Sequence, residues 1–499
     1  MDSESIQFDA KVNALEKLPK DVTLKLRHQH IGASVTLFFK QNPLKIVRGE
    51  GQYMYDEEGN EYLDCINNVA HVGHCHPHVV KAGADQMALI STNSRYLHDN
   101  LVIYAKRLTS YFPSKLSVCY FVNSGSEAND LAIRLARCHT KHKDVIALDG
   151  AYHGHLTTII DISSYKFKKI NDGKQKKWVH VVPLPCSYRG KYTTDKHSET
   201  EIGMLYAKEV QNLINNAHNS GRNIAAFITE SMISCGGQVV LPHHFLKTAY
   251  KYVREAGGVC IADEVQVGFG RTGNMWAFES QDVVPDIVTI GKPIGNGHPI
   301  ACVVTTPEIA KSFENIGTEY FNTYGGNPVS LAIANGVLDV IENENLREHA
   351  VKVGNYLKKA LKAYKDQYPV IGDVRGEGLF LGVELVVNRD TKEPAIPLAE
   401  YMVSRFRDEK ILMSTEGKYG NVLKFKPPMV FSMGDAERFL QTFHQILQEV
   451  YSRDNKLSYL SQLSHSSESS NESLNSLTES LSINSDEDRN YESSSSNSS

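Results

Sequence analysis

The sequence has little of what would place it in a membrane, in an oxidising compartment or on nucleic acid. No apolar run approaches the length of about 18 residues that a membrane-spanning helix needs. The eight cysteines are scattered singly, without a CxxC pair, which favours reduced thiols and an intracellular protein over a disulfide framework. A net charge of −5 provides no general attraction to nucleic acid or to an anionic membrane.

The N-terminal stretch also lacks the features of a targeting segment. It contains no arginine before Arg27 and carries acidic residues at Asp2, Glu4 and Asp9. Signal peptides need an apolar core, and mitochondrial presequences are rich in arginine and poor in acids. This stretch therefore favours a cytoplasmic protein.

What is present is a long chain of ordinary composition. Its 499 residues, 41% hydrophobic and 22% charged, have room for two or three domains and a large core. Short apolar runs alternate with helical patterns at 201–217 and 243–256, which is typical of a parallel sheet covered by helices on both faces. The runs expected to be strands are Val118–Val122, Val145–Leu148, Val179–Val182, Ile224–Thr229, Val259–Ala262 and Ile287–Ile290.

Changes in pattern divide the chain into four parts. Residues 1–65 include a hairpin around Glu58-Gly59-Asn60 and are expected to form the N-terminal segment of a small domain. Residues 66–328 carry the alternating pattern and form a large domain. Residues 329–455 have the pattern of an α+β unit that completes the small domain. Residues 456–499 are rich in serine and almost free of aromatics, which predicts disorder.

The run from Asn123 to Asp130 has the features of an anion site. It follows a predicted strand, and Ser124 with Glu127 has the pattern of a capping box at a helix start. Free N–H groups at Gly125 and Ser126, together with the helix dipole, would attract a phosphate there. An ordinary capped helix is the alternative.

Two other strand ends carry complementary chemistry. The run Val259–Ala262 ends at Asp263, and the run Ile287–Ile290 is followed by Gly291 and Lys292. If these strands are neighbours, the carboxylate and the amine meet at the edge where parallel sheets bind ligands. Asp263 and Lys292 could form a structural ion pair. Alternatively, Lys292 could be an ordinary surface charge. The other possibility is a ligand that has an aldehyde and a protonated ring nitrogen.

Pyridoxal 5′-phosphate satisfies all of these features at once. Its aldehyde takes the amine of Lys292, and its ring nitrogen takes the carboxylate of Asp263. Its phosphate suits the predicted helix start at Gly125, and the rings of Tyr152 and His153 suit its ring. We therefore expect this cofactor.

Two patterns resemble known sites but lack their context. The stretch 71–78 holds four histidines and one cysteine, but Gly73 and Pro77 break any helix that could present them as ligands. We expect a structured loop there and no metal. Residues 268–273 fit GxGxxG without directly following a strand or opening a clear helix, so we do not expect a dinucleotide site.

Three runs resemble the class III aminotransferases, which are pyridoxal-phosphate enzymes of fold type I. They are 123–128 (Asn-Ser-Gly-Ser-Glu-Ala), 262–273 (Ala-Asp-Glu-Val-Gln-Val-Gly-Phe-Gly-Arg-Thr-Gly) and the Gly291-Lys292 site, and the similarity covers about residues 25–452. The resemblance implies an α/β fold with a mostly parallel seven-stranded sheet in the large domain. It also implies a smaller α+β domain built from both termini.

The resemblance also implies roles for individual residues. Lys292 would hold the cofactor as a Schiff base, Asp263 would pair with its ring nitrogen, and Gln266 would lie near its ring hydroxyl. Thr323 would reach the phosphate of a neighbouring subunit's cofactor, which implies a homodimer with shared active sites, or a tetramer. The full set of implied cofactor contacts is Gly125, Ser126, Tyr152, His153, Asp263, Gln266, Lys292 and Thr323.

Within the family, the chain is more similar to the phospho-lyase branch. The runs that carry this similarity are 65–77, 92–100, 230–237 and 319–328. The branch implies elimination of phosphate from phosphoethanolamine, giving acetaldehyde, ammonia and phosphate, and it favours a mitochondrial location. The alternatives are a 5-phosphohydroxylysine phospho-lyase, an aminotransferase using alanine with glyoxylate or pyruvate, and an inactive scaffold that signals through the serine-rich tail.

The substrate is then a small phosphorylated amine, held by cationic side chains. The candidates are Arg95, His74, His98 and Arg375. For Arg95 a structural ion pair is an equal alternative. Ornithine-type aminotransferases have a glutamate where this chain has Cys235, and that glutamate restrains the arginine to which Arg375 corresponds. We therefore expect Arg375 to lack that partner and to be free for a phosphate or carboxylate.

Overall fold

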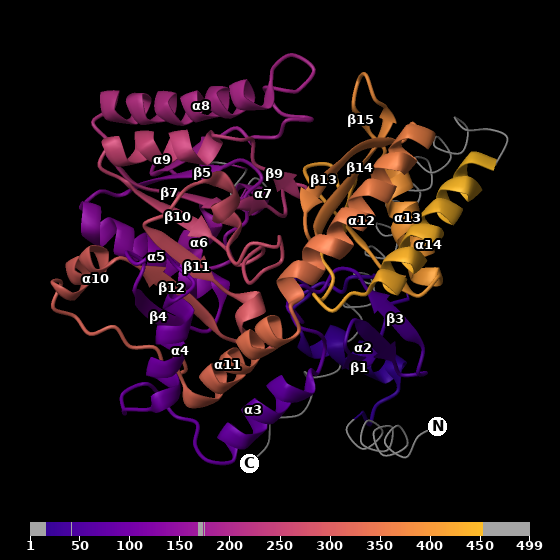
Figure 1. Ribbon diagram of the computed structural model, residues 1–499, viewed down its shortest axis with the longest axis horizontal. Helices are drawn as coiled ribbons and strands as arrows, with labels where there is room; N and C mark the ends of the chain where they lie inside the picture. The colour runs from indigo at the N-terminus through magenta and orange to yellow at the C-terminus, as the bar shows by residue number, and fades with distance from the viewer. Residues whose placement is uncertain (1–15, 41, 168–172, 174, 453–499) are drawn as a thin grey trace, which may run out of the picture.

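The computed structural model describes residues 16–40, 42–167, 173 and 175–452. The stretch 456–499, predicted to be disordered, lies outside these residues. Two parts lie side by side in Figure 1, a larger one around a seven-stranded sheet and a smaller one made largely of C-terminal helices and strands. In the part of the chain that the structure describes, no helix is both long and apolar enough to cross a membrane.

A seven-stranded sheet forms the centre of the larger part and confirms the predicted architecture. Of its described strands, β12 alone runs antiparallel to its neighbours, and the other six are parallel. Every run predicted to be a strand is one, to within a residue at either end. In order across the sheet the strands are β4 (Val118–Val122), β12 (Ala301–Thr305), β11 (Ile287–Ile290), β10 (Val259–Asp263), β7 (Ile224–Glu230), β5 (Asp144–Leu148) and β6 (Val179–Val182).

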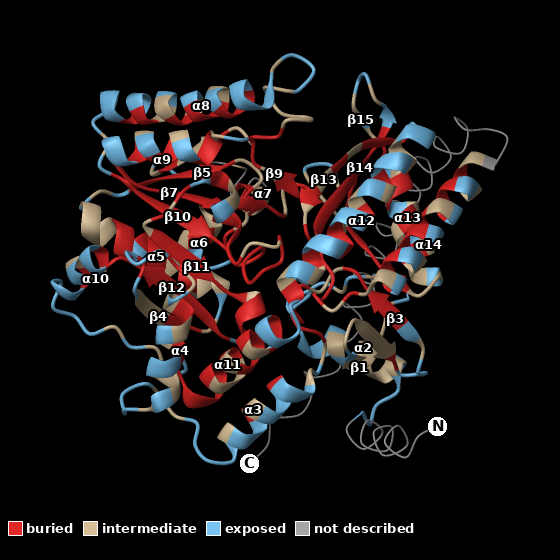
Figure 2. Cartoon of the chain, in the orientation of Figure 1, coloured by how far each residue is buried: buried red, intermediate tan, exposed pale blue. Residues whose placement is uncertain are grey.

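Helices cover both faces of this sheet, because alternate residues of each strand point to opposite sides. Ile261 of β10 packs in a cluster with α5 and α10, whereas Cys260 and Ala262 belong to the cluster that contains α8 and α9. Figure 2 shows the strands almost wholly buried and the outer sides of α8 and α9 exposed. These helices are α5 (Gly125–Thr140), α8 (Glu199–Asn219), α9 (Phe245–Glu255) and α10 (Pro307–Glu314).

The smaller part joins segments from both ends of the described chain. One sheet has the order β1-β2-β3-β16, in which β3 and β16 pair in parallel, and the β2–β3 connection is the predicted hairpin. A second sheet, β13-β14-β18-β17, packs against α12 and α13, and α14 packs on these helices. The bounds are β1 (Ile46–Glu50), β2 (Tyr53–Asp56), β3 (Glu61–Asp64), β13 (Ile371–Glu377), β14 (Phe380–Asn388), β16 (Ile411–Leu412), β17 (Ser414–Glu416), β18 (Val422–Phe425), α12 (Leu346–Gln367), α13 (Ile396–Asp408) and α14 (Met433–Ser452).

Shorter elements and connecting helices complete the described chain. Helix α11 leads from the large sheet to the smaller part, and it packs on α3 and α4. The bounds of these elements are α2 (Lys20–His30), α3 (Pro77–Met87), α4 (Asp99–Thr109), α6 (Thr157–Ile160), α7 (Ser164–Phe167), β8 (Met232–Ile233), β9 (Val239–Val240), α11 (Pro328–Asn343), β15 (Glu393–Pro394) and two 3₁₀ turns at Ala277–Gln281 and Lys292–Gly295.

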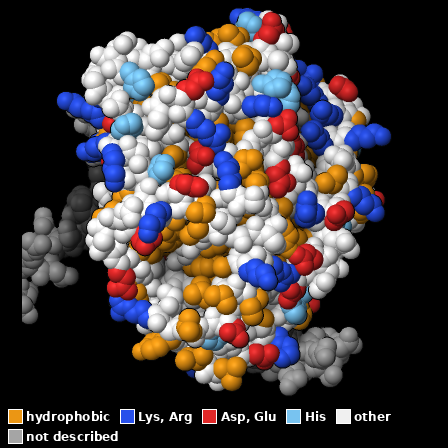
Figure 3. All heavy atoms as spheres, turned by 60° about the vertical axis from the view of Figure 1, so that its left-hand side comes forward, with side chains coloured by type: hydrophobic (Ala, Val, Ile, Leu, Met, Phe, Trp, Pro, Cys, Tyr) orange, Lys and Arg blue, Asp and Glu red, His pale blue; other side chains and the backbone are white. Residues whose placement is uncertain are grey.

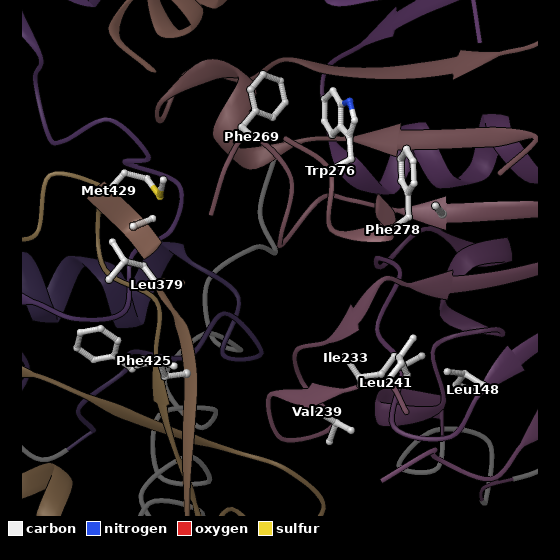
Figure 4. Packing of buried hydrophobic residues seen from close by; sticks show 14 of the residues in the cluster. Leu148, Ile233, Val239, Leu241, Phe269, Trp276, Phe278, Leu379, Phe425 and Met429 are labelled. Carbon is white, nitrogen blue, oxygen red and sulfur yellow. The ribbon is translucent and has the colours of Figure 1, made fainter. Parts of the chain in front are cut away.

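One apolar cluster continues from the larger part into the smaller one. The rings of Phe269 and Trp276 pack edge to face, with their centroids 5.2 Å apart. Leu379 and Met429, which come from C-terminal segments, belong to the same cluster and lie across from Phe269 in Figure 4. Because buried side chains are close-packed, this shared core holds the two parts in a fixed relation.

Gly203 illustrates how closely α8 packs on the chain before α9. A Cβ at this position would lie 1.9 Å from the carbonyl oxygen of His243. We expect Gly203→Ala to lower the free energy of unfolding by about 1–3 kcal/mol, although alanine favours helices. Gly434 in α14 is the matched control, because its added Cβ would meet only Ser432 Oγ, at 3.7 Å. Urea unfolding measures the free energy of unfolding of Gly203→Ala and Gly434→Ala. An equal decrease in the two variants would contradict the close packing at Gly203.

Candidate functional site

The carboxyl ends of the parallel strands meet at one edge of the large sheet, where a cavity of about 330 Å³ lies. Strands β10 and β11 are paired neighbours, so Asp263 and Lys292 lie at adjacent strand ends. Seven of the eight predicted cofactor contacts line the cavity, and the exception is Thr323, which is exposed on a separate loop. The lining residues are Val69, Asn123, Ser124, Gly125, Ser126, Asn129, Tyr152, His153, Gly154, Asp263, Val265, Gln266, Lys292, Gly297, His298, Pro299 and Ile300.

Lys292 is held in an unusual conformation at the end of β11. Its φ is +35°, a region that is costly for a residue with a Cβ, by roughly 1–3 kcal/mol. Burial lowers the pKa of Lys292, the nearby charge of Asp263 opposes this, and the charge of Lys424 adds to the lowering. The amine is therefore more often uncharged than that of an exposed lysine, as a nucleophile or a base requires.

Asp263 is a buried carboxylate held by three donors. Its Oδ2 accepts a hydrogen bond from Asn129 Nδ2 at 2.8 Å and lies 2.8 Å from His153 Nδ1. Its Oδ1 accepts from the backbone N–H of Val265 at 3.0 Å. Among the described residues, the buried Nε2 of His153 has no hydrogen-bond partner. His153 thus orients the acid, and its second nitrogen remains for a ligand in the cavity.

The start of α5 forms an anion cup opposite the acid. Ser124 caps the helix by accepting from the N–H of Glu127 at 3.2 Å, and the Glu127 carboxylate accepts from the N–H of Asn123 at 2.8 Å. The N–H groups of the first turn and the positive end of the helix dipole are left for an anion. Gly125 is required here, since an added Cβ would lie 2.9 Å from Val265 Cγ1.

Gln266 and Tyr152 complete the lining. The Oε1 of Gln266 accepts from Asn68 Nδ2 at 2.8 Å and from Lys426 Nζ at 2.9 Å, which leaves its Nε2 for the cavity. The N–H of Tyr152 donates to Glu230 Oε1 at 3.2 Å, and burial raises the pKa of Glu230 to about 7. An amine, an acid, an anion cup, a ring and an amide donor thus surround one space.

The sequence prediction missed Lys424, Lys426 and Glu416, which approach this site from the smaller part. Lys426 is buried and donates to Ser234 Oγ at 2.6 Å as well as to Gln266. Lys424 donates to Glu416 Oε1 at 2.8 Å. The available signal was the alternation Lys-Phe-Lys at 424–426, because residues i and i+2 of a strand share a face.

None of the four predicted substrate residues lines this cavity. Arg95 is exposed, pairs with Glu319 at 3.2 Å and lies over the ring of Phe321. His98 caps α4 by accepting from the N–H of Asn100 at 3.2 Å. The Nε2 of His74 lies 2.8 Å from Asp64 Oδ2. Arg95 thus forms the ion pair that was its alternative, and the roles of these three residues in substrate binding stay predictions.

Arg375 has no glutamate partner at position 235, as predicted, but it is not free, because two other acids bind it. Its Nη1 donates to Asp373 Oδ2 at 2.9 Å and to Glu384 Oε2 at 2.8 Å, and its Nε and Nη2 donate to the carbonyl of Gly237. The two acids come from paired positions of β13 and β14, which the comparison at Cys235 could not reveal. Arg375 is already satisfied by these partners.

The histidines of the 71–78 stretch point to separate partners. His71 Nε2 lies 2.7 Å from the carbonyl oxygen of Phe269, and burial beside Arg271 lowers the pKa of His71 to about 3. His76 and His78 lie against acids of α11 and its end. Within the described residues, no three His, Cys, Asp or Glu side chains are placed to hold a metal ion together.

Comparison with known proteins gives a consistent family. Residues 39–447 match the Aminotransferase class-III family. The chain is 54% identical over 439 residues to the alanine–glyoxylate aminotransferase 2-like protein of Drosophila melanogaster, covering 88% of this chain and 89% of the relative. It is 42% identical over 440 residues to ethanolamine-phosphate phospho-lyase homolog 1 of Caenorhabditis elegans, covering 86% and 93%.

Solved structures agree with the sequence relatives. A phospholyase from Arthrobacter in complex with phosphoethanolamine superposes with a TM-score of 0.81 and 35% identity, covering 85% of this chain and 99% of that one. The cavity offers this family's cofactor an amine, a buried acid and an anion cup. The chain therefore belongs to the class III aminotransferase family, whose cofactor, pyridoxal 5′-phosphate, is also its own.

Proposed function

We propose that this enzyme is a phospho-lyase that converts phosphoethanolamine and water into acetaldehyde, ammonia and phosphate. The observation that carries the proposal is the cavity in which Lys292, an amine with a lowered pKa, lies beside the buried Asp263. Two similarities support the choice of reaction, one to a phospho-lyase homolog and one to a phospholyase whose structure contains phosphoethanolamine.

Each part of the cofactor has a counterpart in the cavity. Lys292 would hold the aldehyde carbon, and Asp263 would keep the ring nitrogen protonated. Tyr152 and His153 would contact the ring, and Gln266 Nε2 would donate to the ring hydroxyl. The N–H groups of α5 at Gly125 and Ser126 would hold the phosphate. When bound, the cofactor supplies an electron sink for the carbon next to the substrate nitrogen.

The chain's own residues move the proton and hold the leaving group. With substrate bound, the free Nζ of Lys292 would remove a proton from the carbon that bears the substrate nitrogen. Cationic side chains stabilise the phosphate as its C–O bond breaks and the electron pair leaves with it. Return of a proton to the carbon that carried the phosphate, followed by addition of water to the carbon that bears the nitrogen, would then release acetaldehyde and ammonia.

The enzyme acts as a homodimer with shared active sites in this proposal. Figure 3 shows hydrophobic side chains gathered on the lower part of one face, at the height of α3 and α4 in Figure 1. Exposed apolar residues in this region are Met87, Leu89, Tyr96, Leu97, Val102, Ile103 and Tyr324. In this dimer Thr323, which precedes Tyr324 in the chain, would reach the partner's cofactor phosphate. Sedimentation velocity tests the proposal, and a monomer at micromolar concentration contradicts it.

An aminotransferase is the second candidate, because the relative from Drosophila melanogaster carries that name. The purified enzyme should release phosphate and acetaldehyde from phosphoethanolamine in equal amounts, without any keto acid. Amino transfer from alanine to glyoxylate or pyruvate with no phosphate release would contradict the lyase. A parallel assay with 5-phosphohydroxylysine decides between the two phospho-lyases. The mitochondrial location and the domain boundaries at 65, 328 and 455 stay predictions of the sequence.

A further inference from the structure

His298 lines the cofactor cavity, although it is not among the residues that the family resemblance assigns to the cofactor. It lies in the segment that leads from the 3₁₀ turn Lys292–Gly295 into β12. Its ring is partly buried, and burial lowers its pKa, so the ring is neutral at physiological pH. A neutral imidazole has one N–H donor and one acceptor, so its chemistry depends on which nitrogen carries the proton.

The register of the large sheet places His298 beside the start of α5. Strands β4 and β12 are antiparallel, with Ala301 opposite Val122. Residues 298–300, which precede β12, therefore run alongside 123–125, which follow β4 and open α5. Both stretches line the same cavity. The ring of His298 thus lies at the end of the cavity that holds the anion cup.

Hydrogen bonds fix the backbone that presents this ring. The N–H of His298 donates to the carbonyl oxygen of Gly295 at 2.9 Å. The side chain of Asn296 accepts from the N–H of Val72 at 2.9 Å and donates to the carbonyl oxygen of Gly73 at 2.8 Å. These bonds tie the turn to the loop before α3, so the ring is presented from a segment with a defined position.

A chain of hydrogen bonds at the start of α11 sets the tautomer of His298. Asn327 Oδ1 accepts from the N–H of Ser330 at 2.9 Å, and Asn327 Nδ2 donates to the carbonyl oxygen of Tyr324 at 2.7 Å, so the amide has one orientation. The same Nδ2 donates to Ser330 Oγ at 2.7 Å. The hydroxyl hydrogen of Ser330 is then left for His298 Nε2, which lies 2.8 Å away and is its one acceptor among the described residues. Nε2 therefore accepts, and Nδ1 carries the proton.

The Nδ1–H of His298 is consequently a donor that finds no acceptor in the part of the chain that the structure describes. Ser330 does not line the cavity, so the Nε2 side of the ring faces protein and the rest of the ring is left to face the cavity. A neutral donor can wait there without the counter-ion that a buried charge would need. Beside the N–H groups of Gly125 and Ser126, it matches an oxygen of a phosphate group.

We propose that His298 binds the 5′-phosphate of the cofactor, with its Nδ1–H donating to a phosphate oxygen beside the N–H groups of Gly125 and Ser126. His298 would do so in a phospho-lyase and in an aminotransferase alike. The contact matters most when Lys292 acts as a base, because Lys292 no longer holds the cofactor then and retention depends on noncovalent contacts.

Reconstitution of the full-length enzyme after removal of its cofactor tests this contact. Titration with pyridoxal 5′-phosphate and with pyridoxal, followed by absorbance, separates the phosphate from the rest of the cofactor. We expect His298→Ala to weaken binding of pyridoxal 5′-phosphate about 5- to 50-fold and to leave that of pyridoxal within about twofold. His298→Asn keeps an N–H donor on an atom bonded to Cγ, as Nδ1 is, and should recover most of the affinity. Ser330→Ala frees the tautomer and should give an intermediate loss.

His139→Ala is the matched control. His139 Nδ1 also lies at a serine hydroxyl, 2.9 Å from Ser312 Oγ, but His139 is near the far end of α5 and does not line the cavity. Its substitution should leave the affinity for both compounds unchanged. Equal weakening of both compounds in His298→Ala would show that the ring acts through the fold, and no weakening of either would show that it makes no contact. Either result overturns the proposal.

The phosphate of the substrate is the alternative partner of His298. With cofactor bound, the absorbance changes on adding phosphoethanolamine and on adding ethylamine should need the same ratio of concentrations in His298→Ala as in wild type. A loss confined to phosphoethanolamine, with the affinity for pyridoxal 5′-phosphate unchanged, would assign the ring to the substrate and overturn the proposal. A wild-type enzyme that releases no phosphate would contradict only the proposed reaction, because affinity for the cofactor does not depend on turnover.

Discussion

Purified Lys292→Ala should lose the absorbance of lysine-bound cofactor and should release phosphate from phosphoethanolamine at least about 10³-fold more slowly than wild type. Two roles are lost at once, the covalent hold on the cofactor and the base that removes the proton. Burial, which lowers the pKa of Lys292, makes a free base available at neutral pH. The positive φ of Lys292 is strain that alanine shares, so the variant should fold normally.

Lys311→Ala is the control for the loss of a lysine as such. Lys311 lies on the exposed side of α10 and pairs only with Glu314, at 3.0 Å, among the described residues. Its substitution should leave both absorbance and turnover within about twofold of wild type. Added methylamine should partly restore turnover in Lys292→Ala, because a small amine fits where the side chain was. Full turnover with an intact absorbance band in Lys292→Ala would refute the assignment of this residue.

Most of the large sheet could be predicted because its strands are buried on both faces. The sequence of such a strand is a short apolar run. Each of the six runs predicted to be strands is a strand in the structure. The seventh strand, β12, has the same apolar character but was not predicted. Its antiparallel direction is set by the short connection from β11 through the turn at 292–297, and composition does not encode direction.

Local patterns also predicted the cavity side of the site. Asp263 ends β10, Lys292 lies two residues beyond β11, and Gly125 begins α5, and parallel strands bring such ends to one edge. The side that faces the smaller part could not be predicted in this way. Lys426 meets Ser234 and Gln266 across 192 and 160 residues, through the packing of one sheet on another.

The error at Arg375 has a specific cause. Its partner Glu384 lies nine residues later, on the strand that pairs with its own. Predicting that contact requires the register of β13 against β14, and a shift of one residue would turn either side chain to the opposite face. Cys235 shows only that one position lacks an acid. In the structure the acid that pairs with Arg375 is Glu384, on the neighbouring strand.

Asp263→Asn should reduce the rate of phosphate release by about 10²- to 10⁴-fold while the cofactor stays attached to Lys292. The amide has nearly the shape of the carboxylate, and its single oxygen can still accept from either Asn129 Nδ2 or the N–H of Val265. What is lost is the negative charge that keeps the ring nitrogen of the cofactor protonated, and with it the capacity to take up electrons. Absorbance should therefore report a bound cofactor in an enzyme that turns over slowly.

Glu264→Gln provides a matched control one residue further along the chain. Glu264 is also a buried carboxyl group, but it bonds Ser231 Oγ and the N–H groups of Ala277 and Phe278, and it does not line the cavity. Burial raises the pKa of Glu264 to about 7, so the substitution removes only part of a charge, and it deprives one N–H group of its acceptor, as Asp263→Asn does. Glu264→Gln should keep turnover within about threefold. If Asp263→Asn stays equally active, the ring nitrogen is held by another group. If both variants lose activity together with cofactor content, Asp263→Asn acts by disturbing the folded structure. The role of the Asp263 charge at the ring nitrogen is then contradicted.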